Sequence, residues 1–196
     1  MQGYYRQPTI HNNKLVFVSE DDLWTVHLND PVAIRLTANN SEVSSPLFSP
    51  DGKFIAYIGT EDGGSEIYTM PSNGGPSKRL TYDGAFISQI SLWLDKTIYY
   101  SSTLSSTIGR VLDLRKIHSS GGSSSPMNYG MARSISISDH GTVLGKNTAD
   151  PARWKRYKGG TAGEILIDNS NKNIFKKLFH IEGNIANPFW IDNKIF

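Results

Sequence analysis

The stretch Phe48-Ser49-Pro50-Asp51-Gly52-Lys53-Phe54-Ile55-Ala56-Tyr57-Ile58 decides the fold of this chain. It joins a turn rich in Pro, Asp and Gly to a run of five apolar residues, which is the pattern of a tight turn followed by a β-strand. A Gly-rich turn at 61–64, a second apolar run at 66–70, a turn at 73–76 and the triplet Arg79-Leu80-Thr81 come next. This order predicts four short strands joined by three turns.

The same order of turns and apolar runs recurs along the chain. Asp51, Asp95 and Asp139 follow one another at intervals of 44 residues, and so do the pairs Leu36-Thr37 and Leu80-Thr81. A period of about 40–45 residues with four short strands per unit is typical of β-propeller blades. The further copies begin at Asn12-Asn13-Lys14, Leu94-Asp95-Lys96, Ser138-Asp139-His140-Gly141 and Trp190-Ile191-Asp192-Asn193-Lys194.

We therefore expect an all-β chain, a β-propeller of four-stranded antiparallel blades with about four complete blades and the start of a fifth. The repeat predicts blades at 7–37, 44–82, 86–127, 131–179 and 184–196, with an insertion of about nine residues in the fourth. Each blade buries both faces only by stacking on its neighbours. The recurring aromatic residues should fill these interfaces: Trp24, Phe48, Tyr57, Tyr68 and Trp93.

Four of the turns between the first and second strands of a unit fit a two-residue hairpin. A type I′ hairpin requires positive φ at both central positions, which Asn, Asp and Gly tolerate best. The predicted hairpins are at Asn12-Asn13, Asp51-Gly52, His140-Gly141 and Asp192-Asn193, whereas Leu94-Asp95-Lys96 departs from the pattern and is expected to use another turn.

The composition narrows the class of protein. The chain has 196 residues, a net charge of +2 and no cysteine, which excludes disulfides and thiolate metal sites and gives no support for a nucleic-acid or acidic-membrane partner. The N-terminal residues lack the apolar segment of a signal peptide, and no apolar run is long enough to cross a membrane. We expect a soluble, cytoplasmic protein.

A search for catalytic and metal-binding motifs identifies none. The sequence contains no Gly-x-Ser-x-Gly, no His-Glu-x-x-His and no phosphate-binding loop, and its five histidines are scattered. We predict no catalytic residue, no cofactor and no metal. The acidic residues of the turns are expected to bind backbone groups or face solvent: Asp21, Asp22, Asp30, Glu61 and Asp62.

The stretch Arg153-Trp154-Lys155-Arg156-Tyr157 is the one candidate binding segment in the sequence, because it interleaves cations with aromatic rings. Such a mixture is compatible with three roles. The aromatic rings pack on a neighbouring blade while the cations reach water, or the segment binds peptide carboxylates or another domain, or it stacks on nucleic-acid bases. Packing is favoured, and the low net charge argues against nucleic acid.

The blade motif Phe48–Lys53 with the following Arg79-Leu80-Thr81 is similar to TolB-type, WD40-like propeller repeats. The opening Pro8–His11 with Val16–Trp24, and the stretch 147–163 with its order Asn-Thr, Pro, Trp-Lys-x-Tyr and Gly-Gly-Thr-x-Gly, resemble the amino-terminal part of tricorn-type proteases. This second resemblance covers essentially the whole chain.

The resemblance to tricorn-type proteases implies a role without catalysis for this segment. In that family a six-bladed amino-terminal propeller precedes a second propeller and the catalytic domains of a hexameric, cytoplasmic, largely archaeal serine peptidase. The enzyme cleaves oligopeptides released by the proteasome, and its propellers form passages to the active site. The catalytic residues lie beyond Phe196, so none is assigned here. The partners implied are the remaining domains, oligopeptides and further copies of the full-length protein.

The sequence leaves alternatives to this function open. Since Phe196 falls inside the fifth of six expected blades, we expect either a piece of a longer protein or an interrupted reading frame. A stand-alone TolB-like interaction module and a non-functional relic are the two other hypotheses. An open propeller exposes blade faces and strand edges, so the isolated chain is predicted to aggregate or to pair with another copy.

Overall fold

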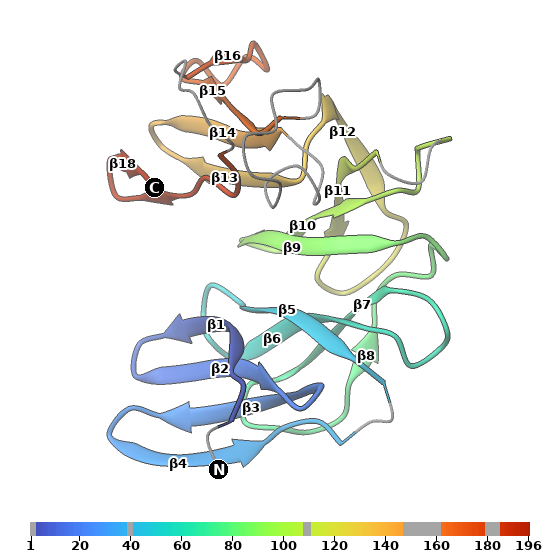
Figure 1. The fold of residues 1–196 in the computed structure, drawn as a ribbon, viewed down its shortest axis with the longest axis vertical. Coiled ribbons are helices and arrows are strands. Elements are labelled where there is room, and N and C mark those ends of the chain that lie inside the picture. The colour runs from blue at the N-terminus through green and yellow to red at the C-terminus, as the bar shows by residue number, and fades with distance from the viewer. Residues whose placement is uncertain (1–2, 39–40, 108–110, 147–161, 179–184) are drawn as a thin grey trace.

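The computed structural model describes residues 3–38, 41–107, 111–146, 162–178 and 185–196, and all regular structure in these ranges is β-strand. Four four-stranded antiparallel sheets and one two-stranded hairpin follow one another along the chain (Figure 1). In each sheet the strands pair in chain order, so every sheet is a simple meander. Among the described residues there is no helix long and apolar enough to cross a bilayer.

The strands of the five sheets have the following bounds. The first sheet contains β1 (Arg6–His11), β2 (Lys14–Ser19), β3 (Asp22–His27) and β4 (Asp30–Arg35). The second contains β5 (Val43–Phe48), β6 (Phe54–Gly59), β7 (Glu66–Pro71) and β8 (Lys78–Arg79). The third contains β9 (Ile87–Leu94), β10 (Thr97–Ser102), β11 (Asp113–His118) and β12 (Ser125–Met131). The fourth contains β13 (Ser134–Ser138), β14 (Gly141–Lys146), β15 (Glu164–Asp168) and β16 (Lys176–Lys177), and the hairpin contains β17 (Trp190–Ile191) and β18 (Lys194–Ile195).

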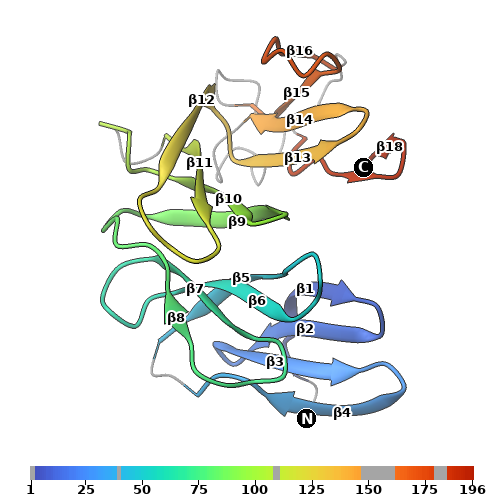
Figure 2. The same cartoon turned by 180° about the vertical axis from the view of Figure 1, so that it is seen from behind.

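The sheets form an arc in which each sheet packs its face on the next (Figures 1 and 2). The first strands of successive sheets are in contact, β1 with β5, β5 with β9, β9 with β13 and β13 with β17. These five strands therefore form the inner edge of the arc. β12 reaches Met131, the residue at which the fourth blade was expected to begin.

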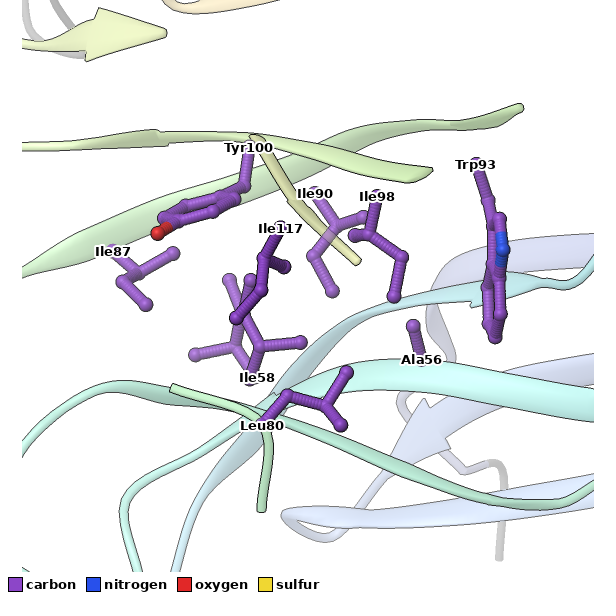
Figure 3. Packing of buried hydrophobic residues seen from close by; sticks show 10 residues of the cluster. Ala56, Ile58, Leu80, Ile87, Ile90, Trp93, Ile98, Tyr100 and Ile117 are labelled. Carbon is purple, nitrogen blue, oxygen red and sulfur yellow. The ribbon is translucent and has the colours of Figure 1, made fainter. Parts of the chain in front are cut away.

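Three apolar clusters fill the spaces between the sheets. The strand β6 shows how they form, because its alternating side chains point to opposite faces of the sheet. Ile55 and Tyr57 pack toward the first sheet, and Ala56 and Ile58 pack toward the third (Figure 3). All four are buried, which explains why the run Phe54–Ile58 is continuously apolar rather than alternating. A third cluster around Leu114, Ile135 and Leu144 joins the third and fourth sheets.

Four of the five aromatic residues predicted for these interfaces are buried there: Phe48, Tyr57 and Tyr68 between the first two sheets, and Trp93 between the second and third. The fifth, Trp24, does not lie between the described sheets. It pairs with Phe17 on the face of the first sheet that points away from the second sheet, and it is half-buried. Its indole N–H donates to the Ser19 carbonyl over 3.0 Å.

The hairpin turns differ from the predicted type I′ geometry. Asn12, Asp95 and Asp192 each take the first central position of a two-residue turn with φ of 51°, 50° and 51°, but the residue after each lacks positive φ. The Asp95 turn therefore matches the turns at Asn12 and Asp192, contrary to expectation. In the fourth sheet Ser138 pairs with Gly141, so the central residues are Asp139 and His140 rather than His140 and Gly141.

The predicted hairpin at Asp51-Gly52 is part of a longer loop. The Gly52 N–H donates to the Ser49 carbonyl over 2.8 Å, and the Ser49 N–H donates to the Phe54 carbonyl over 2.9 Å. Pro50 follows Ser49 in this turn, a position that its fixed φ favours. Gly52 has φ of 69°, and a Cβ there would collide with the ring of His11 in the first sheet. Glycine is thus required at position 52 because this loop packs against the neighbouring first sheet.

Candidate functional site

Hydrogen bonds between side chain and backbone join the inner strands of neighbouring sheets. The Ser45 N–H on β5 donates to Oε1 of Gln7 on β1 over 2.7 Å, and the Ile90 N–H on β9 donates to Oγ of Ser45 over 2.9 Å. Further along the arc, the Trp190 N–H donates to Oγ of Ser136 over 3.1 Å. Polar bonds at the inner edge therefore join the first sheet to the second, the second to the third and the fourth to the fifth.

Two of these bridging residues lie in β-bulges that precede a proline. Gln7-Pro8 stands opposite the single residue Phe17, and Ser45-Pro46 stands opposite the single residue Tyr57. Gln7 and Ser45 have φ of 50° and 54°, a region that L residues seldom adopt and that costs on the order of 1–3 kcal/mol per residue. A bulge re-aims the side chain of the extra residue, here toward the next sheet.

The start of the fifth unit repeats this feature. Asn187 has φ of 53° and precedes Pro188, shortly before β17. Three of the five units thus have a positive-φ residue followed by proline, within the inner strand or just before it. The sequence reasoning missed this feature, although the three X-Pro pairs occur at the same place in their units and were the available signal.

Lysine side chains link neighbouring sheets away from the inner edge. Nζ of Lys14 on β2 lies 2.5 Å from Oδ1 of Asn73 in the second sheet and also reaches the Ser72 carbonyl. Nζ of Lys78 on β8 donates to the Ser120 carbonyl of the third sheet over 2.7 Å. Burial lowers the pKa of Lys14 below its ordinary value. These contacts hold successive sheets in register at the turns.

The third strand of each four-stranded sheet begins with an acidic residue. In the second sheet Glu66 is fully buried, and Nη2 of Arg79 lies 2.9 Å from its Oε1. The Thr81 hydroxyl donates to the other carboxylate oxygen, and the Ile67 N–H donates to the Thr81 hydroxyl over 2.8 Å. The hydrogen bonds of Glu66, Arg79 and Thr81 therefore hold the outer strand of the second sheet against its third strand.

The first sheet contains the same arrangement. Asp22 is buried, its Oδ1 accepts from the Thr37 hydroxyl over 2.6 Å, and Arg35 pairs with its Oδ2. The Leu23 N–H donates to the Thr37 hydroxyl over 2.9 Å. Asp22 was expected to be a turn residue bound to backbone or solvent, and that expectation was wrong because an arginine and a threonine of the outer strand meet it.

The fourth sheet has a related pair. Nζ of Lys177 on β16 lies 3.1 Å from Oε1 of Glu164, and Nζ of Lys146 lies 3.4 Å from Oε2. The hydrogen bond from Lys177 and the charge of Lys146 hold the pKa of Glu164 below its ordinary value, against the opposing effect of burial. Here lysine replaces arginine, while the acid keeps its place at the start of the third strand.

The third sheet departs from this arrangement at Asp113, the first residue of β11. Its strand partner is Met131, which occupies the place of Thr37 and Thr81. The register then shifts, so Pro126 pairs with Arg115 at the position where the first two sheets have Arg35 and Arg79. Both carboxylate oxygens of Asp113 are buried and accept no hydrogen bond within the described residues. Nη1 of Arg115 lies 3.6 Å from Oδ2, which is too long for a hydrogen bond.

A cavity of about 410 Å³ lies beside Asp113. Its walls include the apolar side chains Val111, Leu112, Pro126 and Met131. A second cavity of about 270 Å³ lies between the second and third sheets, where Phe54, Met70 and Trp93 line it together with Lys78 and Ser119. The indole N–H of Trp93 has no hydrogen-bond partner within the described residues. Both cavities have room for a small ligand or a side chain.

The candidate docking residues Arg153, Trp154, Lys155, Arg156 and Tyr157 lie outside the described residues, so their role stays a prediction. In the part of the chain that the structure describes, no three His, Cys, Asp or Glu residues gather where a metal ion would bind. Asp62 and Asp21 pair with the arginines Arg79 and Arg6 rather than with backbone groups.

Four-stranded antiparallel sheets that stack face to face, with their first strands side by side at an inner edge, define a β-propeller, and each sheet is one blade. The tricorn protease N-terminal β-propeller domain matches residues 2–196 of the sequence. This chain belongs to that family.

Similar proteins support the assignment of the chain to this family. The chain is 35% identical over 196 residues to tricorn protease homolog 1 of Streptomyces coelicolor, covering 98% of this chain and 18% of that protein. It is 33% identical over 178 residues to a putative tricorn-like protease N-terminal subunit of Sulfurisphaera tokodaii, covering 88% of this chain and 90% of that protein. The chain thus spans about a fifth of the first relative and most of the second. Since Streptomyces is bacterial, the expectation of an archaeal protein is not confirmed.

Solved structures show the same fold. The crystal structure of the tricorn protease superposes with a TM-score of 0.87 at 26% identity, over 100% of this chain and 20% of that chain. A putative TolB from Agrobacterium tumefaciens superposes with a TM-score of 0.71 at 17% identity, over 95% of this chain and 65% of that chain. The likeness to TolB shows the fold alone.

Proposed function

We propose that this chain is the non-catalytic amino-terminal propeller portion of a tricorn-type serine peptidase that degrades oligopeptides downstream of the proteasome in the cytoplasm. The family match over residues 2–196 carries the proposal. The likeness to a Sulfurisphaera protein of similar length, whose name describes an N-terminal subunit, is compatible with assembly from more than one chain. The inner strands frame a passage toward the active site, and the full-length protein assembles as a homo-oligomer.

The face of the first blade that points away from the second blade supports a docking role. Ile10, Leu15 and Val26 pair across β1, β2 and β3 on this face, and Phe17 and Trp24 pair beside them. Ile10 is 58% exposed. Alternation places these side chains opposite Val16 and Leu23, which pack on the second blade. We propose that further blades of the propeller, on the same polypeptide or on a second chain, cover this apolar face.

The size of the native polypeptide tests the proposal. An antibody against residues 150–163 is used on a denaturing gel of source-cell extract and then for purification under native conditions. A band several-fold larger than 21.7 kDa, or a band at 21.7 kDa that copurifies with a second chain and with oligopeptide hydrolysis, is expected. A band at 21.7 kDa without associated peptidase would exclude the proposal.

A matched pair of variants tests the docking face in the assembled protein. Ile10→Asp places a charge on the face proposed to be covered, whereas Ile34→Asp places one on the opposite face of the same blade. The two isoleucines are 58% and 61% exposed, so the substitutions should affect the isolated blade alike. We expect Ile10→Asp to weaken assembly and peptidase activity, and Ile34→Asp to preserve both. Equal effects of the two variants would contradict a docking role for this face.

A further inference from the structure

Asp113 in the third blade lacks the cation that the corresponding acids of the other three blades receive. In the first, second and fourth blades the acid that begins the third strand receives a cation from the outer strand: Arg35, Arg79 and Lys177. In the third blade the strand register places Pro126 at that position, and β12 contains no cationic residue. Tyr129, two residues before Met131, contacts the fourth blade instead. Its hydroxyl bonds Oδ1 of Asn173 over 3.0 Å, and its ring packs on Phe175, both in the fourth blade. The outer strand of the third blade therefore supplies no cation to Asp113.

Arg115, the one cation that pairs with Asp113 among the described residues, bonds other groups. Nη1 of Arg115 donates to the Ser105 hydroxyl over 2.8 Å, and Nη2 donates to the Ser124 hydroxyl over 3.0 Å. At 3.6 Å from Oδ2 of Asp113, the guanidinium offsets part of the charge but satisfies neither oxygen. A buried carboxylate without hydrogen bonds destabilises the fold, and a bound donor removes that penalty.

The cavity beside Asp113 has room for such a donor. Its volume of about 410 Å³ lies in the range of small-ligand pockets. Val111, Leu112, Pro126 and Met131 give it apolar walls that suit methylene groups, and Asn128 adds a polar group. The lining therefore matches an aliphatic chain that ends in a nitrogen-rich cation.

We infer that Asp113 and this cavity form a binding site for a guanidinium or primary ammonium group on a short aliphatic chain. The ligand supplies to Asp113 what the arginines and the lysine supply to the acids of the other blades. An arginine or lysine side chain of a peptide and a free small amine share this chemistry. The inference goes beyond the proposed peptidase function and does not depend on it.

Binding of agmatine, which is a butyl chain with a guanidinium and an ammonium end, tests the site by isothermal titration calorimetry on the protein carrying this chain. We expect agmatine to bind and butylurea, its uncharged counterpart, to bind at least about tenfold more weakly, because bonds to charged groups contribute about 1.5–3 kcal/mol. A capped arginine peptide distinguishes the source. Binding of this peptide as well as agmatine indicates a side-chain site, whereas binding of agmatine alone indicates a small-amine site. No binding of either probe overturns the proposal.

Three variants locate the binding. Asp113→Asn should reduce agmatine affinity at least about tenfold. Asp95→Asn, which removes an exposed carboxylate of the same sheet in a turn that accepts Asn, should not change it. Met131→Lys places an ammonium on the strand neighbour of Asp113, so the protein should fill its own site, lose agmatine binding and melt at a higher temperature. Unchanged agmatine binding by Asp113→Asn or by Met131→Lys would show that the site is elsewhere.

Discussion

The guanidinium of Arg79 binds two carboxylates at once. Its Nη2 lies 2.9 Å from Oε1 of Glu66, and its Nη1 lies 2.7 Å from Oδ2 of Asp62. The side chain of Glu66 is fully buried, whereas that of Asp62 is 59% exposed. Arg79 therefore connects the buried start of β7 to the exposed turn that precedes it.

Replacing Arg79 by methionine should destabilise the protein strongly. The substitution Arg79→Met retains an unbranched apolar chain but leaves the buried Glu66 without its cation, a change that typically costs about 3–5 kcal/mol. Urea unfolding followed by circular dichroism measures the loss. The control Lys53→Met removes an exposed pair with Asp51 and should cost no more than about 1 kcal/mol. Equal losses in the two variants would contradict a special role for the buried pair.

The stability of the protein should depend on the protonation of Glu66. Burial acts to raise the pKa of this carboxyl group, but hydrogen bonds from Thr81, the Gly84 N–H and Arg79 outweigh it and hold the pKa below the ordinary value of 4.5. A pKa that is lower in the folded state stabilises the protein fully above pH 4.5, and the contribution is lost as the pH falls below that value.

A comparison of the parent with Glu66→Gln between neutral and acidic pH measures this contribution. We expect the free energy of unfolding of the parent to fall more steeply below pH 4.5 than that of Glu66→Gln, which has no proton to gain at this site. Parallel curves for the two proteins would show that Glu66 does not titrate with folding.

Removing the Ser45 hydroxyl should weaken the connection between the second and third blades. In Ser45→Ala the Ile90 N–H loses its acceptor, which costs about 1–3 kcal/mol for a buried donor. The neighbouring Ser44→Ala is the control, because the Ser44 hydroxyl has no hydrogen bond to any described residue. Urea unfolding of both variants gives the difference, and a loss as large in Ser44→Ala would argue against the inter-blade bond.

The chain of 196 residues expressed on its own should associate with further copies. The outward face of the first blade exposes Ile10 and Tyr5, by 58% and 66%, in a chain whose net charge is only +2. Exposed apolar faces favour association. Sedimentation velocity at several concentrations should show a shift to larger species with concentration. A compact monomer at all concentrations would contradict the prediction.

Much of the fold could be predicted from the sequence because the residues that form the turns and strands recur at a regular spacing. The spacing from Asp51 to Asp95 and Asp139, and the apolar run Phe54–Ile58, predict four-stranded units that bury both faces, and the structure confirms this fold. Turn geometry was harder to predict. Asp51-Gly52 looks like a two-residue hairpin in isolation, but its loop is longer because it closes against His11 of another blade.

The acid, cation and hydroxyl groups of the outer strands were missed for a related reason. Asp22, Arg35 and Thr37 recur 44 residues later as Glu66, Arg79 and Thr81, so the signal was present in the sequence. Only the antiparallel pairing of the third and fourth strands brings these three side chains together. The special position of Asp113 could not be predicted from a motif, because what distinguishes this acid is a missing cation on the outer strand of its sheet.

The bulges at Gln7 and Ser45 have a consequence for the order in which the protein forms during synthesis. Each inner strand contacts the first strand of the next blade, and Ser45 accepts a hydrogen bond from Ile90 of the next blade. A chain leaving the ribosome presents its blades from the amino terminus onward. The inner strand of a newly made blade therefore lacks its contacts to the next blade until the first strand of that next blade has been synthesised. Assembly of this protein should run one strand behind translation.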